Sequence, residues 1–248
     1  MLLFCDGMPR SASTWIYNVV FALVKTAFPA ADIRRAVYVS SATFDFLGNG
    51  ADWTVLKCHR LDDDARALFR AGNARAIYTH RDIYDAMASY LVMFRVSFEL
   101  SIGAMRDSLD AYDFHQETGN FLSVDYESIV QRPLQAIHAI AGFIGIDLPA
   151  SEIALIEQAH SLQAIKELCA NLKQLDEREL VRDPLSCYHA DTQWHVRHVR
   201  NGGIGYGRRY LSPQQIDRIY DLIRSRRGPS RNLLPKVPDS PVNLSAAG

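Results

Sequence analysis

A nine-residue segment near the N-terminus, GMPRSASTW at 7–15, constrains the fold of this chain more than any other feature. It follows a short apolar run at 2–5 and leads into a helical pattern at 14–26. A strand, a tight loop and a helix start in this order direct backbone N–H groups and the helix dipole at one point, which favours a bound anion. The segment lacks the second Gly and the Lys of a Walker A loop, so we expect an anionic ligand other than ATP. Side-chain donors at the same point come from Arg10, Ser11, Ser13 and Thr14.

Short apolar runs elsewhere in the chain predict the rest of a sheet. Helical patterns lie between or after these runs, and such alternation predicts an α/β fold. We expect a single domain with a central parallel sheet flanked by helices, and a ligand at the carboxyl ends of its strands. The expected strands are 2–5, 53–58, 76–79 and 121–124, and the expected helices after the first are 62–71, 82–94, 133–144, 150–160, 161–175 and 213–226.

Charge and cysteine content restrict the partners and the compartment. The chain has 27 Lys and Arg against 28 Asp and Glu, so we expect no nucleic-acid partner and an anion site that is local. No apolar run approaches the ~20 residues of a transmembrane helix, and no basic leader is present, so neither a membrane span nor a signal peptide is expected. The four cysteines are widely spaced, which predicts buried thiols and a cytoplasmic location. Homo-oligomerisation stays open.

Two segments lack periodicity. Residues 227–248 contain four prolines and predict an extended or disordered tail after a folded domain of residues 1–226. Residues 180–207 are polar and rich in His and Gly, and a loop of that length inside a compact domain is usually functional. Its histidines, His189, His195 and His198, lack the spacing of a zinc site, so we expect no metal.

A second group of polar residues follows the third expected strand. The guanidinium of Arg81 is suited to bidentate phosphate binding, and Ser89 lies about two turns along the following helix. Alternatively, Arg81 and Asp82 form a surface ion pair and Ser89 is a tolerated small residue. Asp82 is also the expected N-cap of that helix.

Three further segments carry candidate chemistry. His59, at the end of the second strand, can accept a proton, and Lys57 can neutralise charge on a transferring or leaving group. Alternatively, His59 is only a hydrogen-bonded neighbour. Tyr126, after the fourth strand, either flanks a purine ring or packs at the strand end. Residues 200–205, RNGGIG, let the backbone approach a ligand closely or form a surface loop.

These five segments, in this order, resemble the motifs of the PAPS-dependent sulfotransferase family, where PAPS is 3′-phosphoadenosine 5′-phosphosulfate. Residues 9–15, PRSASTW, resemble its 5′-phosphosulfate loop, and 78–89 resemble its 3′-phosphate motif. Residues 57–59, KCH, resemble its Lys-Thr-His, while 125–133 and 200–202 resemble two later segments. The resemblance implies a P-loop-like nucleotide-binding core and no metal.

The resemblance also implies a role for each matching residue. His59 would be the general base, with Lys57 and Arg10 near the transferring sulfuryl group. The residues around the 5′-phosphosulfate would be Arg10, Ser11, Ala12, Ser13 and Thr14. The residues around the 3′-phosphate would be Arg81, Ser89, Arg200, Asn201 and Gly202. Trp15 and Tyr126 would flank the adenine.

Three positions depart from the family pattern. Ala12 replaces a Gly, so the loop must adopt a conformation allowed with a Cβ or carry strain. Arg10 replaces the Lys typical of the animal cytosolic members and keeps the charge but not its point-like geometry. Asn201 replaces a Lys, which weakens a phosphate contact. His80 is a rival for the general base, and residues 160–162 match the adenine-side residues only loosely.

The implied function is transfer of the sulfuryl group from PAPS to an acceptor hydroxyl by in-line displacement, which releases adenosine 3′,5′-bisphosphate (PAP). The alternatives are a degenerate P-loop kinase and a non-catalytic nucleotide-binding module. The acceptor would contact segments 38–50, 91–111 and 180–198. Apolar residues there predict either a wall for a small apolar or phenolic hydroxyl compound or simply helix core, and a carbohydrate or peptide acceptor stays open. These residues are Phe94, Phe98, Leu100, Met105 and Tyr112.

Overall fold

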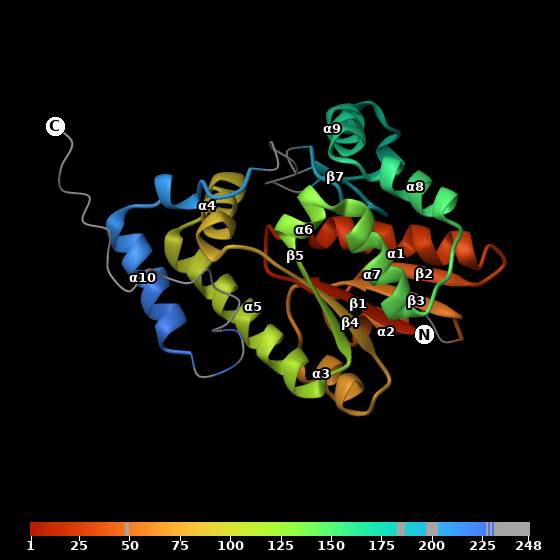
Figure 1. Ribbon diagram of the computed structural model, residues 1–248, viewed down its shortest axis with the longest axis horizontal. Helices are drawn as coiled ribbons and strands as arrows, with labels where there is room; N and C mark the ends of the chain where they lie inside the picture. The colour runs from red at the N-terminus through yellow and green to blue at the C-terminus, as the bar shows by residue number, and fades with distance from the viewer. Residues whose placement is uncertain (48–49, 183–186, 197–202, 227, 229, 231–248) are drawn as a thin grey trace.

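The computed structural model describes residues 1–47, 50–182, 187–196, 203–226, 228 and 230. Its centre is a parallel sheet with the strand order β2-β3-β1-β4-β5 (Figure 1). The strands are β1 (Leu2–Gly7), β2 (Ile33–Val37), β3 (Trp53–Lys57), β4 (Arg75–His80) and β5 (Phe121–Asp125), and a separate antiparallel pair is formed by β6 (Leu180–Arg182) and β7 (Cys187–His189). The predicted α/β fold with a central parallel sheet is confirmed.

Helices cover both faces of this sheet (Figure 1). Helix α1 contacts β1, β3 and β4 and is itself packed against α7 and α8, while α5 contacts β1 and β5. The helices are α1 (Ser13–Ala27), α2 (Ala42–Leu47), α3 (Asp63–Arg70), α4 (Ile83–Phe94), α5 (Phe98–Thr118), α6 (Tyr126–Gln131), α7 (Pro133–Ile144), α8 (Ala150–Ala159), α9 (Leu162–Asn171) and α10 (Pro213–Arg224), with 3-10 turns η1 (Leu172–Gln174), η2 (Glu177–Glu179) and η3 (Gly207–Arg209).

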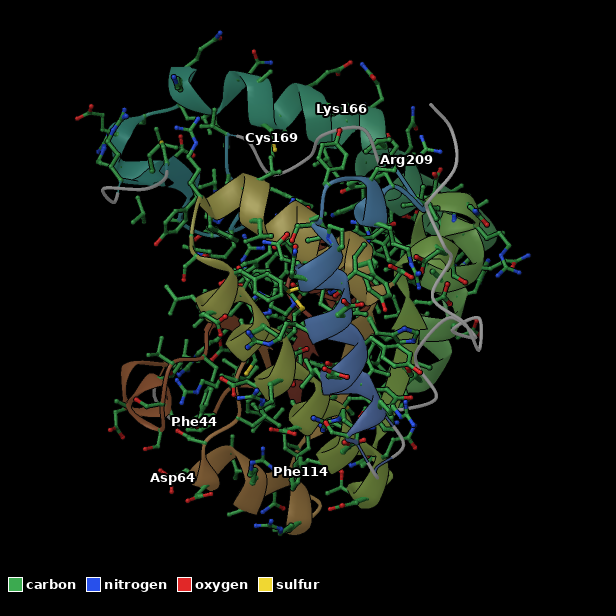
Figure 2. The ribbon with its side chains drawn as sticks, turned by 90° about the vertical axis from the view of Figure 1, so that its left-hand side faces the viewer. Phe44, Asp64, Phe114, Lys166, Cys169 and Arg209 are labelled. Carbon is green, nitrogen blue, oxygen red and sulfur yellow. The ribbon has the colours of Figure 1, made fainter. Side chains whose placement is uncertain are left out.

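Alternate residues of β1 serve two different cores. Leu3 and Cys5 are buried in the cluster formed with α1 and α7, whereas Phe4 is buried in the cluster formed with α3 and α5. This is the expected result for a strand whose successive side chains point to opposite faces and that is covered on both. The second cluster extends to Phe114, which lies toward the same end of the molecule as Asp64 of α3 (Figure 2).

The strand order places the N-terminal loop at the switch point of the sheet. β1 has β3 on one side and β4 on the other; the connection after β1 runs toward β2, whereas the connection after the adjacent β4 runs in the opposite direction, toward β5. The loop after β1 therefore lies beside the carboxyl ends of two neighbouring strands, which is where ligands of such sheets bind. Gly7 allows the close approach, because a Cβ there would lie 2.1 Å from Oγ1 of Thr79 in β4.

Several elements were not expected from the sequence: α2, α6, β6 and β7, and also β2 and α5. β2 contains Arg34 and Arg35 and so does not form an apolar run; the Arg35 guanidinium lies 4.0 Å from the Phe21 ring of α1 instead. Helix α5 is the longest helix that the structure describes, and its buried residues contribute to two clusters on different sides. Such a helix shows no single apolar stripe.

The two segments without periodicity differ from a plain loop and a plain tail. The expected loop 180–207 contains the β6–β7 pair, because Leu180 and Trp194 are buried against the α1 core. Gly228 and Ser230, in the expected tail, lie against Asp113 of α5. The domain boundary at 226 stays a prediction, as does the cytoplasmic location. Among the described helices, none combines the length and apolar character needed to cross a bilayer.

Candidate active site

The side chain of Ser11 anchors the loop between β1 and α1. The buried hydroxyl of Ser11 lies 2.5 Å from the carbonyl oxygen of Met8 and 2.6 Å from Oγ1 of Thr79. Among the described residues, no side chain caps the N-terminus of α1, and the first N–H groups of a helix that lack such a cap can bind an anion. Ser11 thus ties the loop to β4, and its role toward a phosphosulfate stays a prediction.

Ala12 carries the strain that its replacement of a Gly implied. Its φ is 72° and its ψ is 25°, which is left-handed backbone, and Arg10 also has a positive φ of 67°. A side chain with a Cβ is disfavoured there by about 1–2 kcal/mol. The left-handed backbone at Ala12 is therefore imposed by the rest of the loop and is not a conformation that alanine itself favours.

The end of β3 brings a lysine and a histidine to the loop. Nε2 of His59 lies 3.0 Å from Nζ of Lys57 and 3.4 Å from Oγ of Ser13, which begins α1. Nδ1 of His59 lies 3.0 Å from the carbonyl oxygen of Gly7. Because a carbonyl only accepts, the proton of the neutral ring resides on Nδ1, and Nε2 keeps its lone pair.

Burial sets the protonation of this pair. Burial, with the charge of Lys57, lowers the pKa of His59 below its ordinary value, so the ring is neutral at pH 7. Burial also lowers the pKa of Lys57, to about 8, so the ammonium form still predominates at pH 7. The result is a neutral proton acceptor beside a cation that gives up its proton more easily than usual.

Arg81, at the other side of the loop, is buried and closely surrounded. Its Nη1 donates to the carbonyl oxygen of Arg10 at 3.3 Å, and its Nη2 lies 3.4 Å from Oδ2 of Asp85. Its guanidinium carbon lies 4.0 Å from the centre of the Tyr126 ring. Its Nε is buried and has no hydrogen-bond partner among the described residues, so a donor is left for a ligand.

The surface ion pair considered for Arg81 and Asp82 is wrong. Arg81 is only 4% exposed and pairs with Asp85, while the side chain of Asp82 accepts from the backbone N–H of Asp85 as the N-cap of α4. Nε of Arg10 donates to Oγ of Ser89 at 3.0 Å, which connects the loop to the same helix.

Two cavities meet at the loop and share Arg10 and Ala12. The first, of about 260 Å³, is lined by Arg10, Ala12, Trp15, Arg81, Ser89, Tyr126, Ile129, Val130, Pro133, Glu157, His160, Ser161, Leu162, Ile165, Trp194, Gly203 and Tyr206. The second, of about 290 Å³, is lined by Pro9, Arg10, Ala12, Ser13, Thr14, Lys57, His59, Arg60, Tyr90, Met93, Phe94, Ala104, Asp107 and His195. Two molecules bound in these two cavities would therefore meet at the loop.

The first cavity collects the residues expected around a nucleotide. Trp15 and Tyr126 both line it, and Nε1 of Trp15 donates to the carbonyl oxygen of His160 at 2.8 Å. Residues 160–162, which match the family pattern only loosely, also line it. The expected residues Arg200, Asn201 and Gly202 lie outside the described residues.

The lining of the second cavity distinguishes between the two candidate general bases. His59 lines it, whereas His80 lines neither cavity and has its ring against Tyr112, with the ring centres 6.1 Å apart. Of the expected apolar wall, Phe94 lines this cavity, Met105 and Tyr112 are buried core, and Leu100 is 67% exposed. No described residue of 38–50 lines it.

Tyr206 and Asp85 were not singled out in the sequence, whereas His195 and Gly203 lie in segments that were. His195 of the polar segment lines the second cavity, and Gly203 and Tyr206 line the first. Asp85 could have been found as an acidic residue one helical turn after Arg81, a spacing at which side chains meet. Among the described residues, no group of His, Cys, Asp and Glu is arranged to hold a metal ion.

Helix N-termini and arginines at the switch point of a parallel sheet are typical of proteins that bind a nucleotide through its phosphates. A proton acceptor beside a cation lies at the end of the neighbouring strand β3, and this combination is typical of enzymes that transfer a group. The sequence matches the family model of the sulfotransferase domain over residues 3–230, so the chain belongs to the sulfotransferase family. The family expected from the motifs is therefore confirmed.

Solved structures share this fold at low sequence identity. Mouse sulfotransferase SULT7A1 complexed with PAP is 18% identical, with a TM-score of 0.66 over 89% of this chain and 82% of that one. Retinol dehydratase in complex with androsterone and inactive cofactor PAP is 15% identical, with a TM-score of 0.60 over 90% of this chain and 79% of that one. Retinol dehydratase with retinol and PAP is 13% identical, with a TM-score of 0.60 over 90% and 80%. No curated protein sequence matches significantly.

Proposed function

We propose that this chain transfers the sulfuryl group of PAPS to the hydroxyl of a small-molecule acceptor and releases PAP. The observation that carries the proposal is the meeting of two cavities at one loop, with Arg81 in the wall of one and His59 in the wall of the other. A donor nucleotide in the first cavity and an acceptor in the second would present sulfur and hydroxyl to each other across Arg10. The family match and the PAP bound to the fold neighbours support this arrangement.

The nucleotide would be held at both ends by charge-assisted hydrogen bonds. The first N–H groups of α1, with Ser13 and Thr14, would bind the 5′-phosphosulfate. Arg81 would bind the 3′-phosphate through its unsatisfied Nε, assisted by Ser89. Trp15 and Tyr126 would lie against the adenine. These donors suit phosphate and sulfate oxygens.

The chemical step would be a displacement at sulfur. The acceptor oxygen forms a bond to sulfur while the bond from sulfur to the 5′-phosphate oxygen breaks, and PAP leaves with that electron pair. The acceptor proton moves to Nε2 of His59, whose Nδ1–H is held on the Gly7 carbonyl. Positive charge from Arg10 and Lys57 would stabilise the charge that develops on the leaving group.

Lys57 would have two successive partners. Its Nζ lies 3.0 Å from Nε2 of His59, on the lone pair that must accept the proton. The negative oxygens of a bound phosphosulfate compete for the ammonium group and would draw it from the ring. Nucleotide binding would therefore expose the base only when the donor is present.

We propose a small apolar or phenolic hydroxyl compound as the acceptor. The lining of the second cavity includes Tyr90, Met93, Phe94 and Ala104, which favour an apolar body. The androsterone and retinol of the retinol dehydratase structures are of this general kind, and those molecules belong to that protein.

The test is transfer of label from [³⁵S]PAPS to a panel of alcohols, phenols, carbohydrates and hydroxylated peptides, with products identified by mass spectrometry. We expect labelled apolar or phenolic products, and far less label with His59→Ala. Melting in the presence of PAP or ATP separates the kinase alternative, because a ligand at about 100 times its Kd adds ~2.7 kcal/mol. Stabilisation by ATP alone, without sulfuryl transfer, would contradict the proposal.

A further inference from the structure

Asp85, in the first turn of α4, holds a distant segment of the chain by its backbone. Its Oδ1 accepts from the N–H of Gly207 at 2.6 Å, and its Oδ2 accepts from the N–H of Gly205 at 2.7 Å. The carboxylate is 1% exposed, and its two oxygens are used on a segment 120 residues away in the sequence. Burial of a carboxylate costs free energy unless the group is paired. The hydrogen bonds of Asp85 to this segment therefore indicate that the fold requires the segment to lie there.

The segment lies directly on the helix backbone. A Cβ at Gly207 would lie 2.2 Å from the carbonyl carbon of Tyr84, so the contact admits only glycine. The guanidinium carbon of Arg208 lies 4.2 Å from the centre of the Tyr84 ring, which adds a second attachment. Figure 1 shows η3 beside α4, in agreement with the contacts between these two elements.

The same attachment completes the surroundings of Arg81. Tyr206, between the two glycines, places its ring 5.5 Å from the guanidinium carbon of Arg81. Gly203, just before them, accepts a hydrogen bond from Nη2 of Arg81 through its carbonyl oxygen. Oδ2 of Asp85, the oxygen that binds Gly205, also lies 3.4 Å from Nη2. The guanidinium therefore lies near the rings of both Tyr126 and Tyr206, and its buried Nε has no hydrogen-bond partner among the described residues.

We propose that Asp85 is a positioning residue for recognition of the 3′-phosphate: it ties residues 203–207 to α4 and thereby fixes Arg81 before the nucleotide arrives. This inference rests on the proposed function, because it takes Arg81 as the 3′-phosphate ligand. Asp85 itself touches no substrate in this arrangement. Removal of the Asp85 carboxylate should weaken binding of the 3′-phosphate and leave binding of the rest of the nucleotide unaffected.

The test compares two ligands that differ only in the 3′-phosphate, PAP and adenosine 5′-monophosphate, by calorimetry. Asp85→Asn keeps the shape but places an amide group where a second acceptor is needed, and it removes the charge beside Arg81. We expect the Kd for PAP to rise about tenfold or more, the scale of a hydrogen bond to a charged group, while the Kd for the monophosphate changes little. The matched control is Asp82→Asn, three residues away, which keeps an N-cap residue and makes no contact with 203–207 that the structure describes.

Equal weakening of both ligands, or no change in either, would overturn the role of Asp85. Loss of PAP binding in the unmutated protein would instead overturn the proposed function. If Asp85→Asn does not fold, amide hydrogen exchange of the unmutated protein decides. PAP should slow exchange in residues 203–207 more than the monophosphate does, and equal protection by the two ligands would refute the proposal.

Discussion

Replacing Ala12 by glycine should release strain at the centre of the active site. The residue has φ 72° and ψ 25°, a conformation that costs about 1–2 kcal/mol for a residue with a Cβ and almost nothing for glycine. Against this gain stands the greater freedom of glycine in the unfolded chain, worth about 0.4–1 kcal/mol. Loss of the partly buried methyl group offsets up to ~0.8 kcal/mol more.

The informative quantity is a difference between variants. Ala67 lies in the middle of α3 and is exposed, so Ala67→Gly bears the entropy cost without any release of strain and should destabilise the fold by about 0.5–1 kcal/mol. Ala12→Gly should then be more stable than Ala67→Gly by about 0.5–1.5 kcal/mol, after the lost methyl is counted. For a chain of this length this is a difference of roughly 1–6 °C in Tm.

Urea unfolding and calorimetric melting measure this difference. Arg95→Gly is a second control, since Arg95 is exposed at the end of α4 with φ 52° and lies outside both cavities. It should gain stability by the same mechanism. If Ala12→Gly loses as much stability as Ala67→Gly while Arg95→Gly gains, then the loop is not strained at Ala12.

Three functional predictions accompany this one. His59→Ala should lower kcat by about 10²–10⁴-fold and leave the Kd for PAP nearly unchanged; a turnover within a few-fold of the original would exclude His59 as the base. Arg81→Ala should raise the Kd for PAP by roughly 10–100-fold, measured by calorimetry, because a charge-assisted phosphate contact is lost. The pH profile of kcat/KM should keep its activity well below pH 6.5, since the pKa of His59 is lowered and the ring stays neutral there, and should fall above about pH 8 as Lys57 loses its proton. An acid limb at the ordinary histidine pKa would contradict the assignment of the base.

The sequence could predict the parts of the site that depend on strand ends. The apolar runs of β1, β3 and β4 are buried on both faces, so their ends are sharply marked by Arg10, Lys57 and Arg81. A parallel sheet brings such ends to one edge whatever the details of packing. The pairing of His59 with Lys57, two residues apart, follows from the same local geometry.

The parts that could not be predicted depend on contacts between distant segments. The strand character of β2 is hidden because Arg35 stacks on an aromatic ring of α1, a contact that no local pattern reports. The side chain of Ser11 contacts Thr79, 68 residues later, and no local pattern reports that this hydroxyl, expected as a ligand donor, also ties the loop to β4. The two acceptors of Asp85 are directed at glycines of η3 and the preceding turn, 120 or more residues away in the sequence.

Arg10 explains why motifs so far apart in the chain act as one site. Its carbonyl oxygen accepts from Arg81 and its Nε donates to Ser89, while its side chain borders both cavities. Arg10 makes these contacts with a positive φ of 67°, a left-handed conformation that the surrounding structure must hold in place. A residue held by Arg81 and Ser89 therefore also forms part of the wall of the second cavity. Through this one residue the strained loop joins α4 to the second cavity.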